Sequence, residues 1–350
     1  MELQALPPWL APVFQTLVHN GRARGFFHAY LFSGQKGVGH VSLMMQMARL
    51  FLCDQPNWMG DQEDAIVQPA CGNCLGCRGA FGQTHPDLTW IQVKPGEQIR
   101  IETIRALAQD ITLKPHCASR RVIVIDALEA MNLYAANALL KLLEEPPAHV
   151  HFLISTYDKA ALLPTLLSRC QRFDLPLPTQ AQSLPVIAHY LSQHNISQHT
   201  VNDAEKASHS LFYACFQRPY WLYEHPPQQW HLRHEMLDAW LKQKEKHQET
   251  LFECVTLWLT IPKQLVLLYL QSFLQDAIKC AHGLSADFYD HPDLAPLIAR
   301  LAEQHPPELL LHFYQRTEVL HAWVQKKFNL NWQAYFFQFL IDWNQAVQRE

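Results

Sequence analysis

The 350-residue sequence lacks an excess of basic charge, an N-terminal export signal and a long uninterrupted hydrophobic run. Its formal net charge is −4 and its pI about 6.6, which argues against a protein covered in basic surface for gripping nucleic acid by itself. Residues 1–8 contain neither a basic start nor an apolar stretch, so no secretory signal is expected. The most apolar stretch, 255–274, is broken by Pro262 and Lys263, which favours buried helices over a membrane span.

Internal repeats and low-complexity tracts are also missing. With 49% hydrophobic and 17% charged residues, the chain can bury a normal core, and its length suggests two or three domains. The nine cysteines are an odd number, and four of them lie between Cys53 and Cys77. This distribution favours a cytoplasmic protein with a metal site over a disulfide framework.

The first 175 residues alternate between strand and helix patterns. Strands are expected at 28–32, 88–93, 122–125 and 150–155, and helices at 41–53, 101–113 and 135–143. Helices between strands predict an α/β fold with a doubly wound parallel sheet. Proline-marked breaks at 175–178 and 220–229 then separate a small helical module, residues 176–224, from an all-helical segment, residues 225–350.

Three cysteines, Cys71, Cys74 and Cys77, have the spacing C-x-x-C-x-x-C, which is typical of a zinc knuckle. A structural zinc site takes four ligands, and Cys53 is the preferred fourth, with His85 as the alternative. An iron–sulfur cluster would need a further cysteine near position 81, where a phenylalanine stands. The remaining interpretation is that these three cysteines are free thiols. The sequence thus predicts structural zinc.

A glycine-rich turn follows the first predicted strand, with glycines at Gly34, Gly37 and Gly39. Such a turn at a helix N-terminus offers backbone N–H groups to phosphates, and a lysine and a hydroxyl residue normally follow it to hold phosphate and Mg²⁺. His40 and Val41 stand there instead. Histidine is shorter and mostly neutral at pH 7, and valine has no oxygen for a metal. The pattern indicates a degenerate phosphate loop.

Further motifs follow in the same segment. They are a strand ending in Asp126 before Ala127, a helix 137–147 ending in two glutamates and two prolines, a strand ending in Ser155-Thr156, and Ser168-Arg169-Cys170 after a short helix. Taken alone, the helix is amphipathic and Arg169 is a surface arginine. The combination of these motifs is more specific than any one of them alone.

Together these motifs resemble those of the delta-prime subunits of bacterial DNA polymerase III clamp loaders, members of the AAA+ family. The resemblance runs from His28 to Cys170 and, beyond Pro178, rests on helical character alone. It implies an AAA+ core (1–175), a helical lid (176–224) and a C-terminal collar (225–350). It also implies a hetero-pentamer with delta and gamma/tau subunits that opens the sliding clamp and closes it on primer-template DNA, without a membrane.

The resemblance assigns roles to single residues. Ala127 stands where a hydrolytic AAA+ protein carries a water-activating glutamate, so three chemical groups are missing and ATP hydrolysis is not expected. Arg169, flanked by Ser168 and Cys170, would reach a neighbour's ATP, because a guanidinium is always charged and can offset charge on a transferring phosphate. The vestigial nucleotide site would consist of Gly34, Gly37, Gly39, His40, Asp126 and Thr156.

Two other functions are compatible with parts of this pattern. An active gamma/tau-like ATPase would share the loop and the knuckle, and His40, Val41 and Ala127 separate the chain from it. A zinc-dependent nucleic-acid-binding module would need a basic face, but the knuckle offers only Arg78 nearby. In the predicted lid, residues 207–211 lack the glycine and the basic residue that often contact nucleotide in such lids.

Overall fold

The structure, a computed structural model, describes residues 6–56, 69–92, 97–193, 232–242, 248–325 and 330–347. The chain divides into two compact units, Met1–Gln182 and Ser183–Glu350. The three-part division with boundaries at 176 and 225 stays a prediction, because most of the predicted lid, including residues 207–211, lies outside the described residues.

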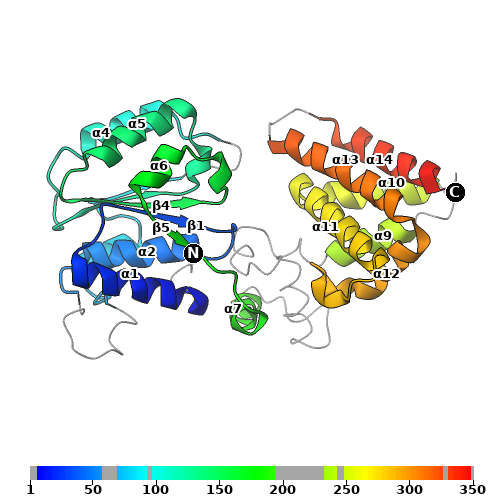
Figure 1. Ribbon diagram of the computed structural model, residues 1–350, viewed down its shortest axis with the longest axis horizontal. Helices are drawn as coiled ribbons and strands as arrows, with labels where there is room; N and C mark the ends of the chain where they lie inside the picture. The colour runs from blue at the N-terminus through cyan, green and yellow to red at the C-terminus, as the bar shows by residue number, and fades with distance from the viewer. Residues whose placement is uncertain are drawn as a thin grey trace. The chain divides into compact units, whose positions relative to one another are not determined.

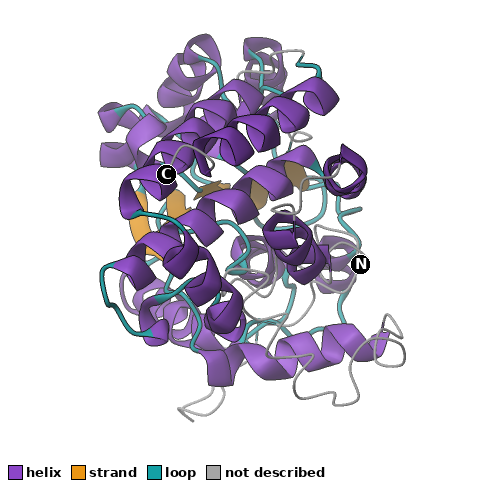
Figure 2. Ribbon diagram, turned by 90° about the vertical axis from the view of Figure 1, so that its right-hand side faces the viewer, coloured by secondary structure: helices purple, strands orange, loops and turns teal. Residues whose placement is uncertain are grey.

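One parallel sheet organises the first unit (Figure 1). Its strands are β1 (Ala29–Ser33), β2 (Leu88–Ile91), β3 (Arg121–Ile125), β4 (Val150–Thr156) and β5 (Gln171–Asp174), in the order β2-β3-β4-β1-β5. All neighbouring pairs are parallel, so each strand must be joined to the next by a crossover. The described strands, orange in Figure 2, all belong to this sheet, which confirms the predicted α/β class.

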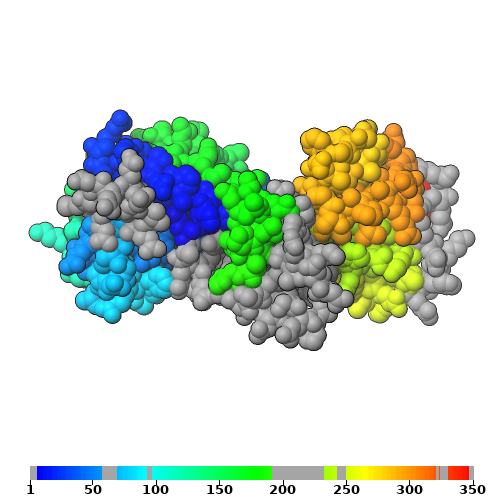
Figure 3. Space-filling view, turned by 90° about the horizontal axis from the view of Figure 1, so that it is seen from below, coloured from blue at the N-terminus to red at the C-terminus, as the bar shows by residue number. Residues whose placement is uncertain are grey.

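Helices cover both faces of the sheet. On one face lie α1 (Ala11–Arg24) and α2 (His40–Leu52), and on the other lie α4 (Ile101–Asp110), α5 (Leu133–Glu144) and α6 (Pro164–Arg169) (Figure 1). Alternate strand residues such as Leu31, Ile123 and Phe152 belong to the core under α4, α5 and α6. In Figure 3, α1 (dark blue) lies on the outside of this unit.

The parallel register brings the carboxyl ends of the central strands to one edge of the sheet. Ser33 at the end of β1 pairs with Thr156 at the end of β4, and Ile125 of β3 lies opposite Ile154. The glycine loop, Asp126 and the segment after β4 therefore meet at that edge, where open α/β sheets place their ligand sites.

Several elements of the first unit were not predicted from the sequence. They are α1, α3 (Leu75–Phe81), β5 and the short helices η1 (Pro8–Leu10), η3 (Leu128–Ala130) and η4 (Lys159–Ala161). Strand β5 lies at the edge of the sheet and its four residues alternate between partly buried and exposed, so it lacks the continuous apolar run of β3. The predicted helices and strands otherwise end within a few residues of the observed ones.

The second unit is helical throughout its described part, as predicted. After α7 (Gln180–Gln193) come α9 (Leu232–Lys242), α10 (Gln248–Thr260), α11 (Lys263–Ala281), α12 (Ala295–Gln304), α13 (Pro307–Gln325) and α14 (Trp332–Val347). Its core is rich in aromatic side chains, with Trp240, Trp258 and Phe339 in edge and tilted contacts. Among the described residues no single helix could cross a membrane; only the pair 250–260 and 263–281, bent by 117°, meets the test of length and composition.

A buried polar network in this bundle fixes His291, one of the twenty histidines of the whole chain. Arg233 donates from Nη1 to Nδ1 of His291 at 2.8 Å, so the ring proton is on Nε2, which lies 2.8 Å from the Ser272 hydroxyl. The Ser272 hydroxyl in turn donates to the Tyr269 carbonyl at 3.0 Å. Complete burial, with Arg233 close by, holds the pKa of His291 well below its usual value. The network therefore requires the neutral ring.

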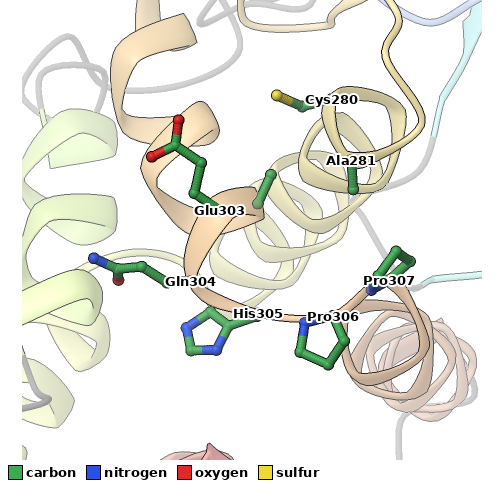
Figure 4. A pocket seen from close by; sticks show the side chains of 8 residues that line it. Cys280, Ala281, Glu303, Gln304, His305, Pro306 and Pro307 are labelled. Atoms are coloured by element: carbon green, nitrogen blue, oxygen red, sulfur yellow. The ribbon is translucent and has the colours of Figure 1, made fainter.

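A surface hollow of about 610 Å³ lies between the ends of two helices in this unit (Figure 4). Cys280 and Ala281 come from the end of α11, Glu303 from α12, and His305-Pro306 from the turn before α13. None of the predicted site residues lines it.

Candidate functional site

The glycine loop leads from β1 directly into α2. Gly37 and Gly39 have φ values of +89° and +104°, a left-handed region in which a side chain is strained, so the backbone path of the loop requires glycine. Gly39 is the N-cap of α2 and His40 its first residue. The loop thus has the local arrangement that suits a phosphate, with a helix N-terminus at its end.

The chain's own N-terminal segment packs against the end of this loop, at Val38 and Gly39. A Cβ placed on Gly39 would lie 2.8 Å from a side-chain carbon of Pro7 and 3.2 Å from one of Leu10. The indole N–H of Trp9 donates to the Val38 carbonyl at 2.9 Å. Trp9, Leu10 and Val38 are almost fully buried. The loop is therefore packed against apolar side chains.

His40 is buried beneath the loop rather than presented from it. Its ring is 2% exposed and packs edge-on against Tyr157, with ring centroids 4.9 Å apart. Neither ring nitrogen has a hydrogen-bond partner among the described residues. Burial lowers the pKa of His40 to about 4, although the nearby Asp126 carboxylate opposes the shift. At neutral pH this side chain carries no charge toward a phosphate.

Asp126 is engaged by its own chain. Its Oδ1 accepts hydrogen bonds from the Ser155 hydroxyl at 2.5 Å and the Tyr157 hydroxyl at 2.7 Å. The next residue, Ala127, has φ +61°, and its N–H donates to Ser155 Oγ at 2.9 Å. A glutamate at position 127 would have to adopt this strained left-handed backbone conformation.

Thr156, expected in the vestigial nucleotide site, donates its hydroxyl to Glu129 at 2.9 Å. The Tyr157 N–H also donates to this carboxylate, at 3.2 Å. Burial raises the pKa of Glu129, although these two hydrogen bonds act in the opposite direction. Glu129 and Tyr157 were missed from the sequence, where the only signal is an acidic residue three positions after Asp126.

The structure brings together Cys53, Cys71, Cys74 and Cys77, whose sulfurs all lie within 4.8 Å of one another. The Cys71–Cys77 and Cys74–Cys53 sulfur distances are 4.0 and 3.9 Å. Four sulfurs in a tetrahedron at ~2.3 Å from Zn²⁺ would be ~3.8 Å apart. The four thiols could therefore hold a metal ion of that size.

Local contacts explain why the thiols meet. Cys53 directly follows α2, and the Cys71 N–H donates to its sulfur at 3.3 Å. The Cys74 sulfur caps α3 by accepting from the Cys77 N–H at 3.2 Å. A Cβ on Gly76 would lie 1.8 Å from the Leu52 carbonyl oxygen, so only glycine lets α3 approach the end of α2 this closely. Backbone N–H groups of residues 73 and 74 lower the pKa of Cys71 to about 6, which favours the thiolate that binds metal.

His85, the alternative fourth ligand, lies in a different group with Asp87 and Cys117. Its Nδ1 accepts from the Asp87 N–H at 3.0 Å, and its Nε2 is 3.7 Å from the Cys117 sulfur. Because Nδ1 is an acceptor, the proton of the neutral ring is on Nε2. The structure thus selects Cys53 over His85 as the partner of the three knuckle thiols.

Asp87 anchors the turn before β3. This fully buried carboxylate accepts three backbone N–H bonds, from residues 116, 117 and 118, at 2.6, 2.9 and 2.9 Å. Burial alone would raise the pKa of Asp87, but these hydrogen bonds outweigh it and lower the value to about 2. Arg121, also buried, lies 3.8 Å away and pairs with Asp110 at 2.9 Å.

We expect Asp87→Asn to destabilise the chain at neutral pH by about 2 kcal/mol, since the ionised acceptor is lost. The pKa of Asp87 is lower in the folded state than its usual 3.8, so its contribution is full above about pH 4 and is lost as the pH falls toward 2. Urea unfolding between pH 7 and pH 3 measures both effects. An equally steep acid loss in the variant would contradict this assignment.

Arg169 is the last residue of α6 and is 36% exposed. Its Nη2 is 2.6 Å from the Glu144 carboxylate, and its Nη1 donates to the Ser168 hydroxyl at 3.3 Å. Cys170 is buried beneath it, and burial raises the pKa of this thiol to about 12, so it is an inert packing residue. The guanidinium lies at the surface, accessible to a partner.

Two family descriptions match the chain. The family described as "DNA polymerase III, delta subunit" matches residues 9–179, and "DNA polymerase III, delta subunit, C terminal" matches residues 227–345. The gamma-subunit-related protein of Thermotoga maritima is a structural neighbour at TM-score 0.43 and 14% identity, covering 96% of this chain and 99% of that one.

Among relatives, the Pseudomonas aeruginosa DNA polymerase III subunit delta-prime is 36% identical over 53% of this chain and 53% of its own length. The Haemophilus influenzae subunit tau/gamma is 34% identical over 48% of this chain, and the match spans 23% of that protein. The Escherichia coli subunit delta-prime is 26% identical over 87% of this chain and 84% of its own length. The match thus spans about half, or less, of the first two relatives. The two family matches, which together span most of the chain, and the two delta-prime relatives agree: this chain belongs to the delta-prime family of DNA polymerase III subunits.

Proposed function

We propose that this chain is a non-hydrolytic subunit of the DNA polymerase III clamp loader, and that Arg169 completes the ATP site of a neighbouring subunit. The observation that carries the proposal is His40, which stands where the loop's lysine is expected and is buried and uncharged beneath the loop.

The chemistry of the loop edge supports the same conclusion. His40 is neutral and buried, Val41 has no metal-binding oxygen, and Ala127 has no carboxylate. The polar groups that do remain, on Asp126 and Thr156, are hydrogen-bonded within the chain. The site thus lacks the lysine and the hydroxyl that normally follow such a loop and the carboxylate base after the strand, which are three groups that phosphoryl transfer uses.

Arg169 is the group with an external role in this proposal. Its guanidinium is exposed and permanently charged, while this chain's own loop lacks the groups that hold ATP and Mg²⁺, so the ATP it serves belongs to another subunit. The partners we propose are the gamma/tau and delta subunits in a hetero-pentamer that acts on the sliding clamp and primer-template DNA in the cytoplasm. The relatives named delta-prime and tau/gamma support this set of partners.

The four-cysteine group is proposed to hold structural zinc. A site with four sulfur ligands leaves no open position for water, so no catalytic step is assigned to the ion. Its place between the end of α2 and α3 gives it a local structural role: it ties residues 71–77 to residue 53.

An active gamma/tau-like ATPase is the second candidate, favoured by the 34% identity to tau/gamma relatives. Titrating the purified chain with ATP and Mg²⁺ separates the two. We expect no phosphate release and weak or absent binding, because the lysine, the hydroxyl and the carboxylate base are missing at positions 40, 41 and 127. Release that disappears in a Gly39→Val variant, in which the added side chain meets Pro7, would favour the ATPase.

A further inference from the structure

We propose that Glu144 is a positioning residue for Arg169: the carboxylate at the end of α5 holds the guanidinium in the orientation in which it meets a neighbour's phosphate. This inference rests on the proposed trans role of Arg169 and deepens it. It connects two sequence motifs: the helix ending in Glu144-Glu145-Pro146-Pro147, and Ser168-Arg169-Cys170. Glu144 and Arg169 are 25 positions apart in the sequence.

The guanidinium is held from two sides. Glu144 Oε1 is 2.6 Å from Nη2, and the Ser168 hydroxyl accepts from Nη1 at 3.3 Å while donating to the Thr165 carbonyl at 2.9 Å. A guanidinium has five N–H donors, and these contacts use two of them. Three donors remain, enough for a bidentate phosphate contact. Glu144 can therefore stay bound while Arg169 acts, so it orients the arginine rather than competing with phosphate for it.

The two anchoring elements are themselves fixed. Leu139 and Leu143 of α5 and Leu166 of α6 are buried in one core beneath the sheet's outer helices, and Cys170 closes the end of α6 in the same core. The backbone that carries both residues is thus rigid, while the side chains of Arg169 and Glu144 are 36% and 47% exposed. Without these contacts, the arginine at the end of this six-residue helix would keep its considerable rotamer freedom until it reached the ATP.

The experiment uses the full chain in the reconstituted clamp-loader complex, with ATP, Mg²⁺, clamp and primed DNA. For Glu144→Ala we expect kcat at the adjoining ATP site, followed by single-turnover hydrolysis, to fall about threefold to tenfold with little change in KM, because a surface ion pair is weak and the arginine acts on the transition state. Glu144→Gln keeps an acceptor oxygen in place and should stay within about twofold of the parent. Glu145→Ala, an exposed neighbour, is the matched control and should be silent.

The double variant Glu144→Ala/Arg169→Ala distinguishes positioning from general damage. If Glu144 acts through Arg169, the double variant turns over ATP at the rate of Arg169→Ala alone. A further loss, or an increase in kcat for Glu144→Ala, overturns the inference. If Arg169→Ala lowers turnover and Glu144→Ala does not, only this inference fails; if Arg169→Ala has no effect, the proposed function fails with it.

Discussion

Replacing Arg169 by alanine should lower ATP hydrolysis at the adjoining site of the assembled complex at least about 100-fold, since an arginine that offsets transition-state charge is worth several orders of magnitude. Hydrolysis summed over the complex should fall by the share of that one site. Folding should be unaffected, because the side chain is 36% exposed and its ion pair contributes at most about 1 kcal/mol. Single-turnover hydrolysis and clamp loading on primed DNA measure the effect.

Arg172→Ala is the matched control for this experiment. It removes an exposed arginine three residues further along, on the edge strand β5. We expect normal turnover from it. Unchanged hydrolysis and clamp loading in a fully assembled Arg169→Ala complex would refute the trans role.

Removal of the proposed zinc ion should produce the largest loss of stability. For Cys77→Ser, or for the chain stripped by a chelator, we expect the unfolding midpoint of the first unit to fall by about 10 °C or more. Structural zinc supplies folding free energy directly, and Cys77 is fully buried between its sulfur neighbours. Protein purified without added zinc should contain about one zinc per chain.

Cys117→Ser provides the control, because this exposed thiol lies outside the four-cysteine group. It should leave both the zinc content and the unfolding midpoint close to those of the parent. A zinc content near zero in natively folded protein would exclude the structural-zinc assignment, and iron in place of zinc would reassign the site.

The composition of the site was predictable from short-range patterns. The C-x-x-C-x-x-C spacing identified three of the four grouped thiols, since ligands in a knuckle lie on one tight turn of chain. The sequence favoured Cys53 as the fourth ligand but could not establish it, because the distance from Cys53 to Cys71 depends on how α3 packs against α2 at Gly76. His85, the alternative fourth ligand by sequence, belongs to another group.

The side-chain contacts around the glycine loop and the ends of the strands could not be predicted from the sequence. Residues 7–10 reach the loop at 38–39 through packing of a short helix that no pattern indicated. Glu129 meets Thr156, and Glu144 meets Arg169, across 27 and 25 positions. Such pairs depend on which strands are neighbours and on where each helix ends.

The sequence by itself determined the alternation of strands and helices, the missing catalytic groups at positions 40, 41 and 127, and the candidate thiols, because each follows from residue type and local spacing. The tertiary structure decided that β1 lies between β4 and β5, that Pro7 and Leu10 pack against Gly39 at the end of the glycine loop, and that Arg169 lies exposed against Glu144. Burial and long-range pairing depend on the packing of elements distant in the chain, which local periodicity does not encode.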